Sequence, residues 1–238
     1  MRSALALLAL AAGPAVFVAA PAPAPEQDSS TFPEPTEGFT IPADDSERWT
    51  VDEVLREYGR VTKQQFLFDE DTQALLRTAH VPVLSDFRVV PEHVHSVVES
   101  ILTENDFVLA VKRTREPRLV SVSSLNSSRR HNVRTNALYV PSEQLSDWRD
   151  HPAYLIHTVI TLDSLDVRAL ATSVRPMIPD ANTQSVLPIG NSNSLILTGL
   201  AHQVVQMADI LKRADEKERE WLESHSDLDP ESEAADER

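Results

Sequence analysis

The chain has 238 residues, contains no cysteine and carries a formal net charge of −15 at pH 7. The absence of cysteine excludes disulfides, cysteine-ligated zinc, thiol catalysis and a lipid-modified N-terminal cysteine. The acidic balance argues against a nucleic-acid-binding surface over the chain as a whole, because such a surface needs Lys and Arg to neutralise phosphates.

The first 24 residues have the pattern of an export signal. Arg2 precedes an apolar run that Gly13 and Pro14 interrupt, and small residues follow. The run before this break is shorter than the roughly 20 apolar residues that a membrane-spanning helix needs. We therefore expect a signal peptide at 1–24 and a periplasmic or cell-envelope location. An uncleaved anchor is the alternative, because prolines follow the alanines at which cleavage would occur.

Residues 25–47 are rich in proline, acidic and small polar residues, and this composition predicts a disordered linker. Within it, only Phe39 to Ile41 are expected to add a short edge strand to the unit that follows.

A small α+β domain is predicted at 48–123. Thr50 and Glu53 have the capping-box spacing at the start of a helix whose apolar residues run to Val61. Pro91 suits the first position of a later helix, where its missing amide is not needed, and Asn105 is expected to close that helix. Strands are expected at 65–68, within 81–90, at 107–111 and at 119–122, and a short helix at 72–78.

Residues 124–153 are interpreted as a second linker, with a short strand at 138–140. The first part of this segment is basic, and it continues a basic stretch that begins at Lys112 and runs to Arg134. Two solvated loops explain these residues, and a docking surface for an acidic partner is the sharper interpretation. The docking residues proposed from the sequence are Arg129, Arg130 and Arg134.

A second α+β domain is predicted at 154–215 in the order β-α-β-β-α, a KH-like topology. A strand at 156–162 leads to a helix capped by Asp163 or Ser164 and stopped by Pro176. The strands at 185–189 and 194–198 form a hairpin, and Gly199 is expected to release the chain into the last helix. The hairpin turn is assigned a structural role carried by Gly190, Asn191 and Asn193. Residues 216–238 are predicted to be an acidic tail, which begins as a frayed helix end containing Trp221 and Leu222 and runs into a solvated, disordered segment.

These residues resemble a known family. The stretches 157–178 and 191–215, with NSLILTG at 193–199 before a helix that ends at an aspartate, are similar to secretin N-domains of the NolW-like type. The stretches 50–71 and 89–111 resemble the short N-terminal domain shared by secretins and TonB-dependent receptors.

The resemblance implies a periplasmic, non-enzymatic module that docks on envelope components of a type II secretion or pilus-like system and assembles into rings. No β-rich segment able to form the outer-membrane pore follows Asp215 in this sequence. We therefore expect an adaptor or accessory subunit, with homo-oligomerisation possible. Contact with a membrane is expected only through partners or an uncleaved signal.

Catalytic and metal chemistry has simpler explanations in this sequence, and no cofactor is expected. His93 and His95 lie two residues apart on a predicted helix and so point in different directions. Asp69, Glu70 and Asp71 suit helix capping. The remaining candidates lack a nucleophile-elbow setting or are expected to be structural histidines: Ser164, Ser192, Ser194, His157 and His202.

Two alternatives of different class stay open. A KH-like RNA-binding protein would need a Gly-x-x-Gly loop, which the corresponding helix boundary does not contain. An envelope enzyme or small-molecule binder would need a deep pocket with converging polar groups.

Overall fold

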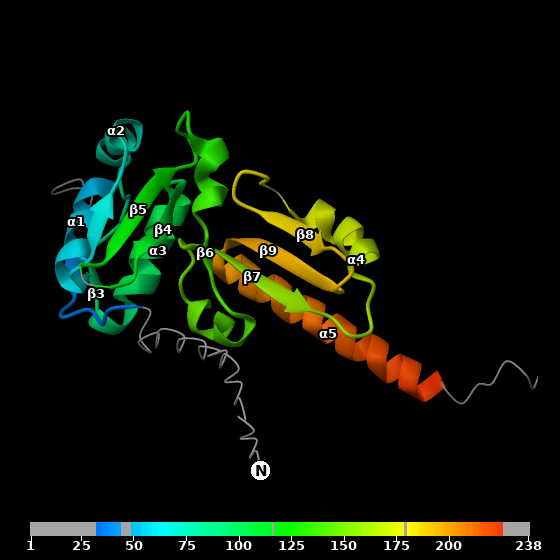
Figure 1. Ribbon diagram of the computed structural model, residues 1–238. Coiled ribbons are helices and arrows are strands. Elements are labelled where there is room, and N and C mark those ends of the chain that lie inside the picture. Colours follow the sequence, from blue (N-terminus) through cyan, green and yellow to red (C-terminus); the bar gives the residue numbers. More distant parts are fainter. Residues whose placement is uncertain (1–31, 44–48, 116, 179, 226–238) are drawn as a thin grey trace, which may run out of the picture. The chain divides into compact units, whose positions relative to one another are not determined.

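The computed structural model describes residues 32–43, 49–115, 117–178 and 180–225. The chain is α+β, as the sequence predicts (Figure 1). The predicted signal peptide, most of the first predicted linker and the end of the acidic tail lie outside the described residues.

The N-terminal half contains two small sheets. Strand β2 (Gln65–Leu67) runs parallel to β5 (Leu119–Ser124), and β5 pairs antiparallel with β4 (Phe107–Arg113). Strand β1 (Phe39–Ile41) pairs antiparallel with β3 (Phe87–Val89). The predicted edge strand at Phe39 to Ile41 is therefore present, although the sequence predicted more strand between 81 and 90 than the three residues of β3.

The same half of the chain contains three helices: α1 (Val51–Thr62), α2 (Glu70–Thr78) and α3 (Val94–Glu104). The capping box of α1 is formed: the Thr50 amide donates to Glu53 Oε2 at 2.7 Å, and the Glu53 amide donates to Thr50 Oγ1 at 3.3 Å. Pro91 begins the 3-10 turn η1 (Pro91–His93), which leads into α3. Asn105 is the C-terminal cap of α3, as predicted.

The segment 124–153, whose composition predicted a linker, contributes to the core. It contains the 3-10 helices η2 (Arg130–Asn136) and η3 (Ser142–Trp148) and the strand β6 (Leu138–Tyr139). Leu145 and Trp148 lie three residues apart, and a 3-10 helix places such residues on one face. This face of η3 packs into the core, so both side chains are buried.

The C-terminal half is built on a four-stranded sheet in the order β6-β7-β9-β8. Strand β7 (Leu155–Thr161) leads to α4 (Val167–Val174) and η4 (Arg175–Met177). The hairpin of β8 (Ser185–Ile189) and β9 (Ser194–Leu200) leads to α5 (Ala201–His225). Helix α5 packs on β7 and β9, and its buried stripe includes Val204, Val205, Ala208 and Leu211 (Figure 1).

A backbone contact joins the two halves of the described chain. The Leu109 amide in β4 donates to the Ala153 carbonyl at 2.8 Å, and Leu109 forms a parallel bridge with Tyr154 just before β7. Leu109, Ala153 and Tyr154 are all at most 1% exposed. This hydrogen bond is therefore shielded from water, and the apolar residues on both sides of it belong to one core.

Two details of the C-terminal half differ from the prediction. The N-cap of α4 is Asp166, whose side chain accepts from the Arg168 amide at 2.8 Å, rather than Asp163 or Ser164. Gly199 lies inside β9, so α5 begins only at Ala201. The helix then continues to His225, through the acidic stretch for which the sequence predicts a frayed helix end.

Asp215 explains why α4 starts late. Its carboxylate accepts hydrogen bonds from the backbone amides of Asp163, Ser164 and Leu165 at 3.0, 2.8 and 2.8 Å. These amides are held by a residue 50 positions away, so they do not form the first turn of α4. The loop after β7 is thereby fixed to α5.

We expect Asp215→Asn to lower the free energy of unfolding by about 1.5–3 kcal/mol, the usual value of a hydrogen bond to a charged group. Partial burial by itself raises the pKa of Asp215, but the three amide hydrogen bonds outweigh it and hold the pKa below its usual value. The stabilisation should therefore be present above about pH 4 and be lost as the pH falls through this lowered pKa. Denaturant unfolding at several pH values measures it.

The exposed neighbour Glu216, changed to Gln, is the matched control and should alter the stability by less than about 0.5 kcal/mol. Equal stabilities of the Asp215→Asn variant and the unaltered protein at neutral pH would show that the loop is held by other contacts.

Candidate protein-interaction surface

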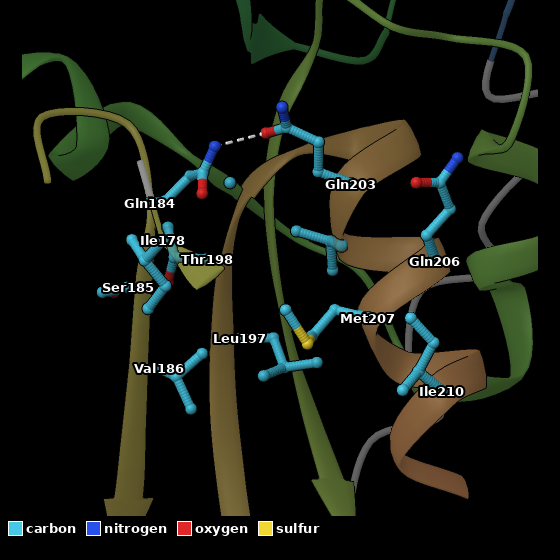
Figure 2. A pocket seen from close by; sticks show the side chains of 12 residues that line it. Ile178, Gln184, Ser185, Val186, Leu197, Thr198, Gln203, Gln206, Met207 and Ile210 are labelled. Atoms are coloured by element: carbon cyan, nitrogen blue, oxygen red, sulfur yellow. Dashed lines mark hydrogen bonds between the residues drawn. The ribbon is translucent and has the colours of Figure 1, made fainter. Parts of the chain in front are cut away.

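An apolar groove of about 230 Å³ lies between the β8–β9 hairpin and α5 (Figure 2). Ile178, Val186 and Leu197 line it from the sheet side, and Met207 and Ile210 line it from the helix. We call it the β8–α5 groove. The remaining lining residues are Gln184, Ser185, Thr198, Gly199, Gln203, Val204 and Gln206.

The groove follows from the way α5 lies on the sheet. Helix α5 packs on β7 and β9, whereas β8 packs against α4, and the groove lies between β8 and α5. Side chains alternate along β8, so Val186 faces the groove whereas Leu187 points to the other face and is 53% exposed. Met207 and Ile210 lie three residues apart on α5, beside its buried stripe, and Ile210 is 51% exposed.

One end of the groove is closed by a hydrogen bond. Gln184 Nε2 donates to Gln203 Oε1 at 2.6 Å (Figure 2). A Cβ atom at Gly199 would lie 3.3 Å from Gln184 Cγ and 3.4 Å from Val204 Cγ2, so any larger residue would crowd this end. Gly199 therefore allows a close approach within β9, which replaces the predicted role of releasing the chain into the helix.

The lining determines what the groove can bind. None of the twelve lining residues carries an ionisable side chain, so the groove offers no acid, base or metal ligand of that kind. Its volume lies below the roughly 300–1,000 Å³ of typical small-molecule sites. The groove is suited to a few apolar side chains of a protein segment, with glutamine amides at its rim.

The outer edge of β8 is poorly suited to the addition of a further strand. β8 is the last strand of its sheet, and Pro188 lies near its middle. Proline has no amide hydrogen to donate, and it commonly protects sheet edges from pairing. The neighbouring groove is therefore the better candidate than edge pairing in this half of the chain.

The three arginines proposed for docking differ in their contacts. Arg129 lies 3.8 Å from the carboxylate of Asp69, the N-cap of α2. Hydrogen bonds from Thr72 are the main cause that lowers the pKa of Asp69, and the charge of Arg129 adds to them. Arg134 donates to the carbonyls of Ala181 and Gln184 at 3.1 and 3.4 Å, and Arg130 is exposed.

The residues assigned to the hairpin turn connect the β8–β9 hairpin to the loop after β7 and to the start of α4. Gly190 and Asn193 have positive φ angles of 45° and 48°. Asn193 Nδ2 donates to the carbonyls of Leu162 and Leu165 at 2.5 and 3.0 Å, and its Oδ1 accepts from the Val167 amide at 3.2 Å. Asn191 makes a different, exposed contact, in which its Oδ1 accepts from Arg168 at 2.7 Å.

The other candidates from the sequence lie apart from the groove. Asp69 caps α2 by accepting from the Thr72 amide at 2.8 Å. His157 Nδ1 lies 3.1 Å from the Ala137 carbonyl, and burial lowers the pKa of His202. The sequence did not single out Val186 or Ile210 for the groove. One feature of the sequence could have indicated the groove: Met207 and Ile210 are apolar but fall outside the predicted buried stripe of α5.

No helix within the described ranges is both long enough and apolar enough to span a membrane.

The fold is shared with a chain of a known secretion complex. The sequence itself matches no protein-family model and no curated protein. The Klebsiella pneumoniae type II secretion system outer membrane complex of PulD, PulS and PulC HR domain aligns with 79% of this chain and 26% of its own, at 20% identity and a TM-score of 0.52. This likeness shows a common fold, and the chain spans about a quarter of that relative's length.

Two further structures align less closely. The N-terminal domain of the secretin XcpQ from Pseudomonas aeruginosa aligns with 75% of this chain and 65% of its own, at 15% identity and a TM-score of 0.27. The enterotoxigenic Escherichia coli GspC–GspD complex aligns with 75% of this chain and 99% of its own, at 14% identity and a TM-score of 0.26.

We expect Asn193→Ala to lower the free energy of unfolding by about 1–3 kcal/mol, because it removes three hydrogen bonds and leaves the backbone groups of Leu162, Leu165 and Val167 without that partner. Asn191→Ala is the matched control. It removes an exposed contact in the same turn, so its effect should stay below about 0.5 kcal/mol. Thermal and denaturant unfolding of both variants measure the difference. Equal effects would contradict the structural role of Asn193.

Proposed function

We propose that this chain is a non-enzymatic protein-interaction module of a type II secretion or pilus-like export system. It acts in the periplasm or cell envelope as an adaptor or accessory subunit. The observation that carries the proposal is the fold shared with the Klebsiella pneumoniae complex over 79% of this chain at a TM-score of 0.52. In that complex PulD is found with PulS and the PulC HR domain, so partners of the same kind are expected here.

The β8–α5 groove supports an interaction role over an enzymatic one. A catalytic site needs groups that exchange protons, act as nucleophiles or hold a metal ion, and the groove lining has no ionisable side chain. Covering apolar side chains that are still partly exposed, such as those of Val186, Met207 and Ile210, lowers the free energy when a partner removes them from water. The groove therefore binds by burial of apolar surface.

The occupant that fits this groove is a short segment of an envelope partner that presents apolar side chains. The glutamines at the rim can hydrogen-bond to the polar backbone of such a segment. Ile210, half exposed on α5, is the apolar side chain that a partner would cover most completely. Pro188 makes strand addition at β8 less suitable, so the segment is held by its side chains.

A second surface for an acidic partner is proposed at Arg129 and Arg130. Arg134 is less available, because its guanidinium holds the carbonyls of Ala181 and Gln184, next to the groove. Arg129 has a side-chain exposure of 73% and only a long, 3.8 Å ion pair with Asp69. Reversing the charge at Arg134 would disturb the fold as well as the surface, so the other two residues give the cleaner test.

A photo-crosslinking residue at position 210 should capture secretion-system or pilus-assembly envelope proteins in intact cell envelopes, identified by mass spectrometry. The same crosslinker at Leu84, which is fully exposed outside the groove, is the matched control and should capture them far less. Ile210→Asp in the tagged protein should reduce their recovery at least about tenfold, because a charge would be buried in an apolar groove. Capture of this chain alone, or of metabolic proteins at both positions, would contradict the proposed function.

Once a partner is identified, the double change Arg129→Glu and Arg130→Glu should weaken its binding by about tenfold, and the loss should be largest at low salt. Titrations of the purified proteins at two salt concentrations measure this effect. Lys217→Glu is the control, since this exposed cation lies on α5 outside the basic segment. Unchanged binding after the double reversal would remove the arginines from the interaction surface.

A further inference from the structure

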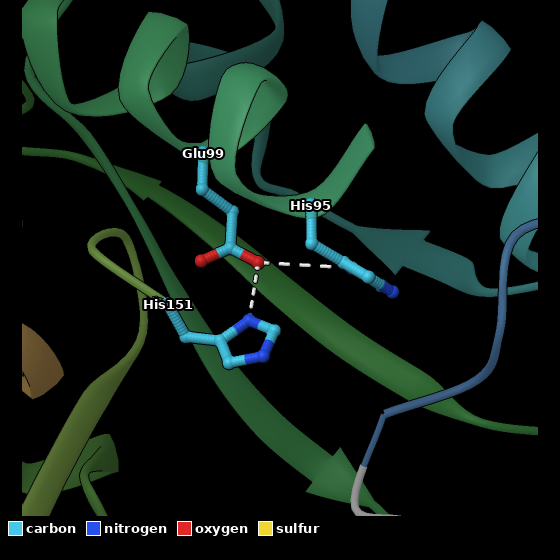
Figure 3. A group of neighbouring side chains, drawn as sticks. All are labelled: His95, Glu99 and His151. Carbon is cyan, nitrogen blue, oxygen red and sulfur yellow. Dashed lines mark hydrogen bonds and ion pairs between the residues drawn. The ribbon is translucent and has the colours of Figure 1, made fainter. Parts of the chain in front are cut away.

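Three potential metal ligands, none of which lines the β8–α5 groove, meet in the interior of the chain (Figure 3). His95 and Glu99 lie on α3, and His151 comes from the segment between η3 and β7. One ligand atom of each residue lies within 4.8 Å of the other two. His151 Nδ1 is 2.8 Å and His95 Nδ1 is 3.8 Å from Glu99 Oε1.

The spacing on α3 brings two of these ligands together. Residues four apart lie on one face of a helix, so His95 and Glu99 point in the same direction. His93, which the sequence paired with His95, is exposed and belongs to the preceding turn η1. The third ligand is distant in sequence, and only the fold places His151 beside α3.

The hydrogen bonds of His95 turn the lone pair of one ring nitrogen toward the cluster. Its Nε2 lies 2.9 Å from the Pro33 carbonyl, which can only accept, so Nε2 carries the hydrogen. In the neutral ring, Nδ1 then presents its lone pair to the cluster, where the Tyr58 hydroxyl donates to it at 2.7 Å. Histidines that bind metals commonly donate their other ring nitrogen to a backbone carbonyl in this manner.

Glu99 is a buried carboxyl group with spare acceptor capacity. It is 0% exposed. Its Oε2 makes no hydrogen bond of good geometry with the described residues, although the Ala153 backbone lies close enough to lower the pKa of the carboxyl. Burial raises the pKa of Glu99 to about 8. A cation that binds at neutral pH therefore displaces the carboxyl proton, and its charge stabilises the carboxylate form that burial otherwise disfavours.

Burial favours the neutral form of both imidazoles, which is the form that binds a metal ion. Burial is the main cause that lowers the pKa of His95, and it lowers the pKa of His151 to about 4. An aromatic shell surrounds them: Phe32 stacks on the His151 ring at 3.3 Å between centroids, and Trp148 and Tyr154 contact Phe32 edge-on. The ligands therefore lie in a water-poor environment, which strengthens their attraction to a cation.

We propose that His95, Glu99 and His151 form a binding site for one divalent cation of the zinc class. Two histidines and one glutamate are a known ligand set for Zn²⁺, with ligand bonds of about 2.0–2.2 Å in tetrahedral geometry. Such bonds keep ligand atoms about 3.4 Å apart. The distance from His151 Nδ1 to Glu99 Oε1 would therefore increase slightly from 2.8 Å, and that from His95 Nδ1 to Glu99 Oε1 would decrease from 3.8 Å. The Tyr58 hydroxyl lies beside the position left for a fourth ligand.

The bound cation would act as a cross-link. It would tie α3 to the segment that leads into β7, next to the backbone contact between Leu109 and Ala153. A chain without cysteine has no disulfide to make such a link. This inference rests on the geometry of the cluster and is independent of the proposed function.

The test uses the full chain after removal of metals with a chelator. Isothermal titration with Zn²⁺ should give one site per chain, and the melting temperature should rise by about 5 °C or more at a 100-fold excess over the dissociation constant. Mg²⁺ should give neither effect, because it prefers oxygen ligands. Cobalt(II), used as a second probe, should show the visible absorption of a four-coordinate ion with nitrogen and oxygen ligands.

Glu99→Gln keeps the shape of the side chain and should weaken Zn²⁺ binding at least about 100-fold while the protein stays folded, as circular dichroism can check. His93→Ala is the matched control and should bind Zn²⁺ as the unaltered chain does. His151→Ala gives a second ligand variant. The proposal is overturned if the unaltered chain shows no Zn²⁺ site at micromolar concentrations, or if folded Glu99→Gln and His151→Ala variants bind as tightly as the control.

Discussion

The hydrogen bond from the Leu109 amide to the Ala153 carbonyl is the contact on which the arrangement of the described chain depends. It joins β4 of the three-stranded sheet to the segment that begins β7, and it is buried among Tyr154, Trp148 and the apolar residues of both halves. Water cannot compete for a bond placed there, so breaking it would leave two buried polar groups without partners. A chain without disulfides relies on contacts of this kind to hold its parts together.

The C-terminal half uses single polar side chains to hold loops that have little apolar surface. Asp215 binds three amides after β7, and Asn193 binds backbone groups of Leu162, Leu165 and Val167. These side chains fix α5 and the β8–β9 hairpin to the same loop. Both walls of the β8–α5 groove are therefore hydrogen-bonded to one loop, and such preorganisation reduces the entropic cost of binding a partner.

The groove and the buried cluster differ in chemistry and suit different roles. The groove is apolar, open and free of ionisable side chains, which favours protein contact. The His95, Glu99 and His151 cluster is polar and enclosed by aromatic rings, which favours a small charged ligand that stabilises the fold.

The sequence by itself determined the α+β class, the capping box at Thr50 and Glu53, the edge strand at Phe39 to Ile41 and the position of the hairpin. These depend on neighbours within a few residues, whose spacing and turn chemistry are visible in the chain. Only the tertiary structure decided the start of α4, the burial of Trp148 in a segment of linker-like composition, the groove beside α5 and the meeting of His151 with α3. Each of these depends on residues about 50 or more positions apart or on the packing of whole elements, and local periodicity carries no information about such contacts.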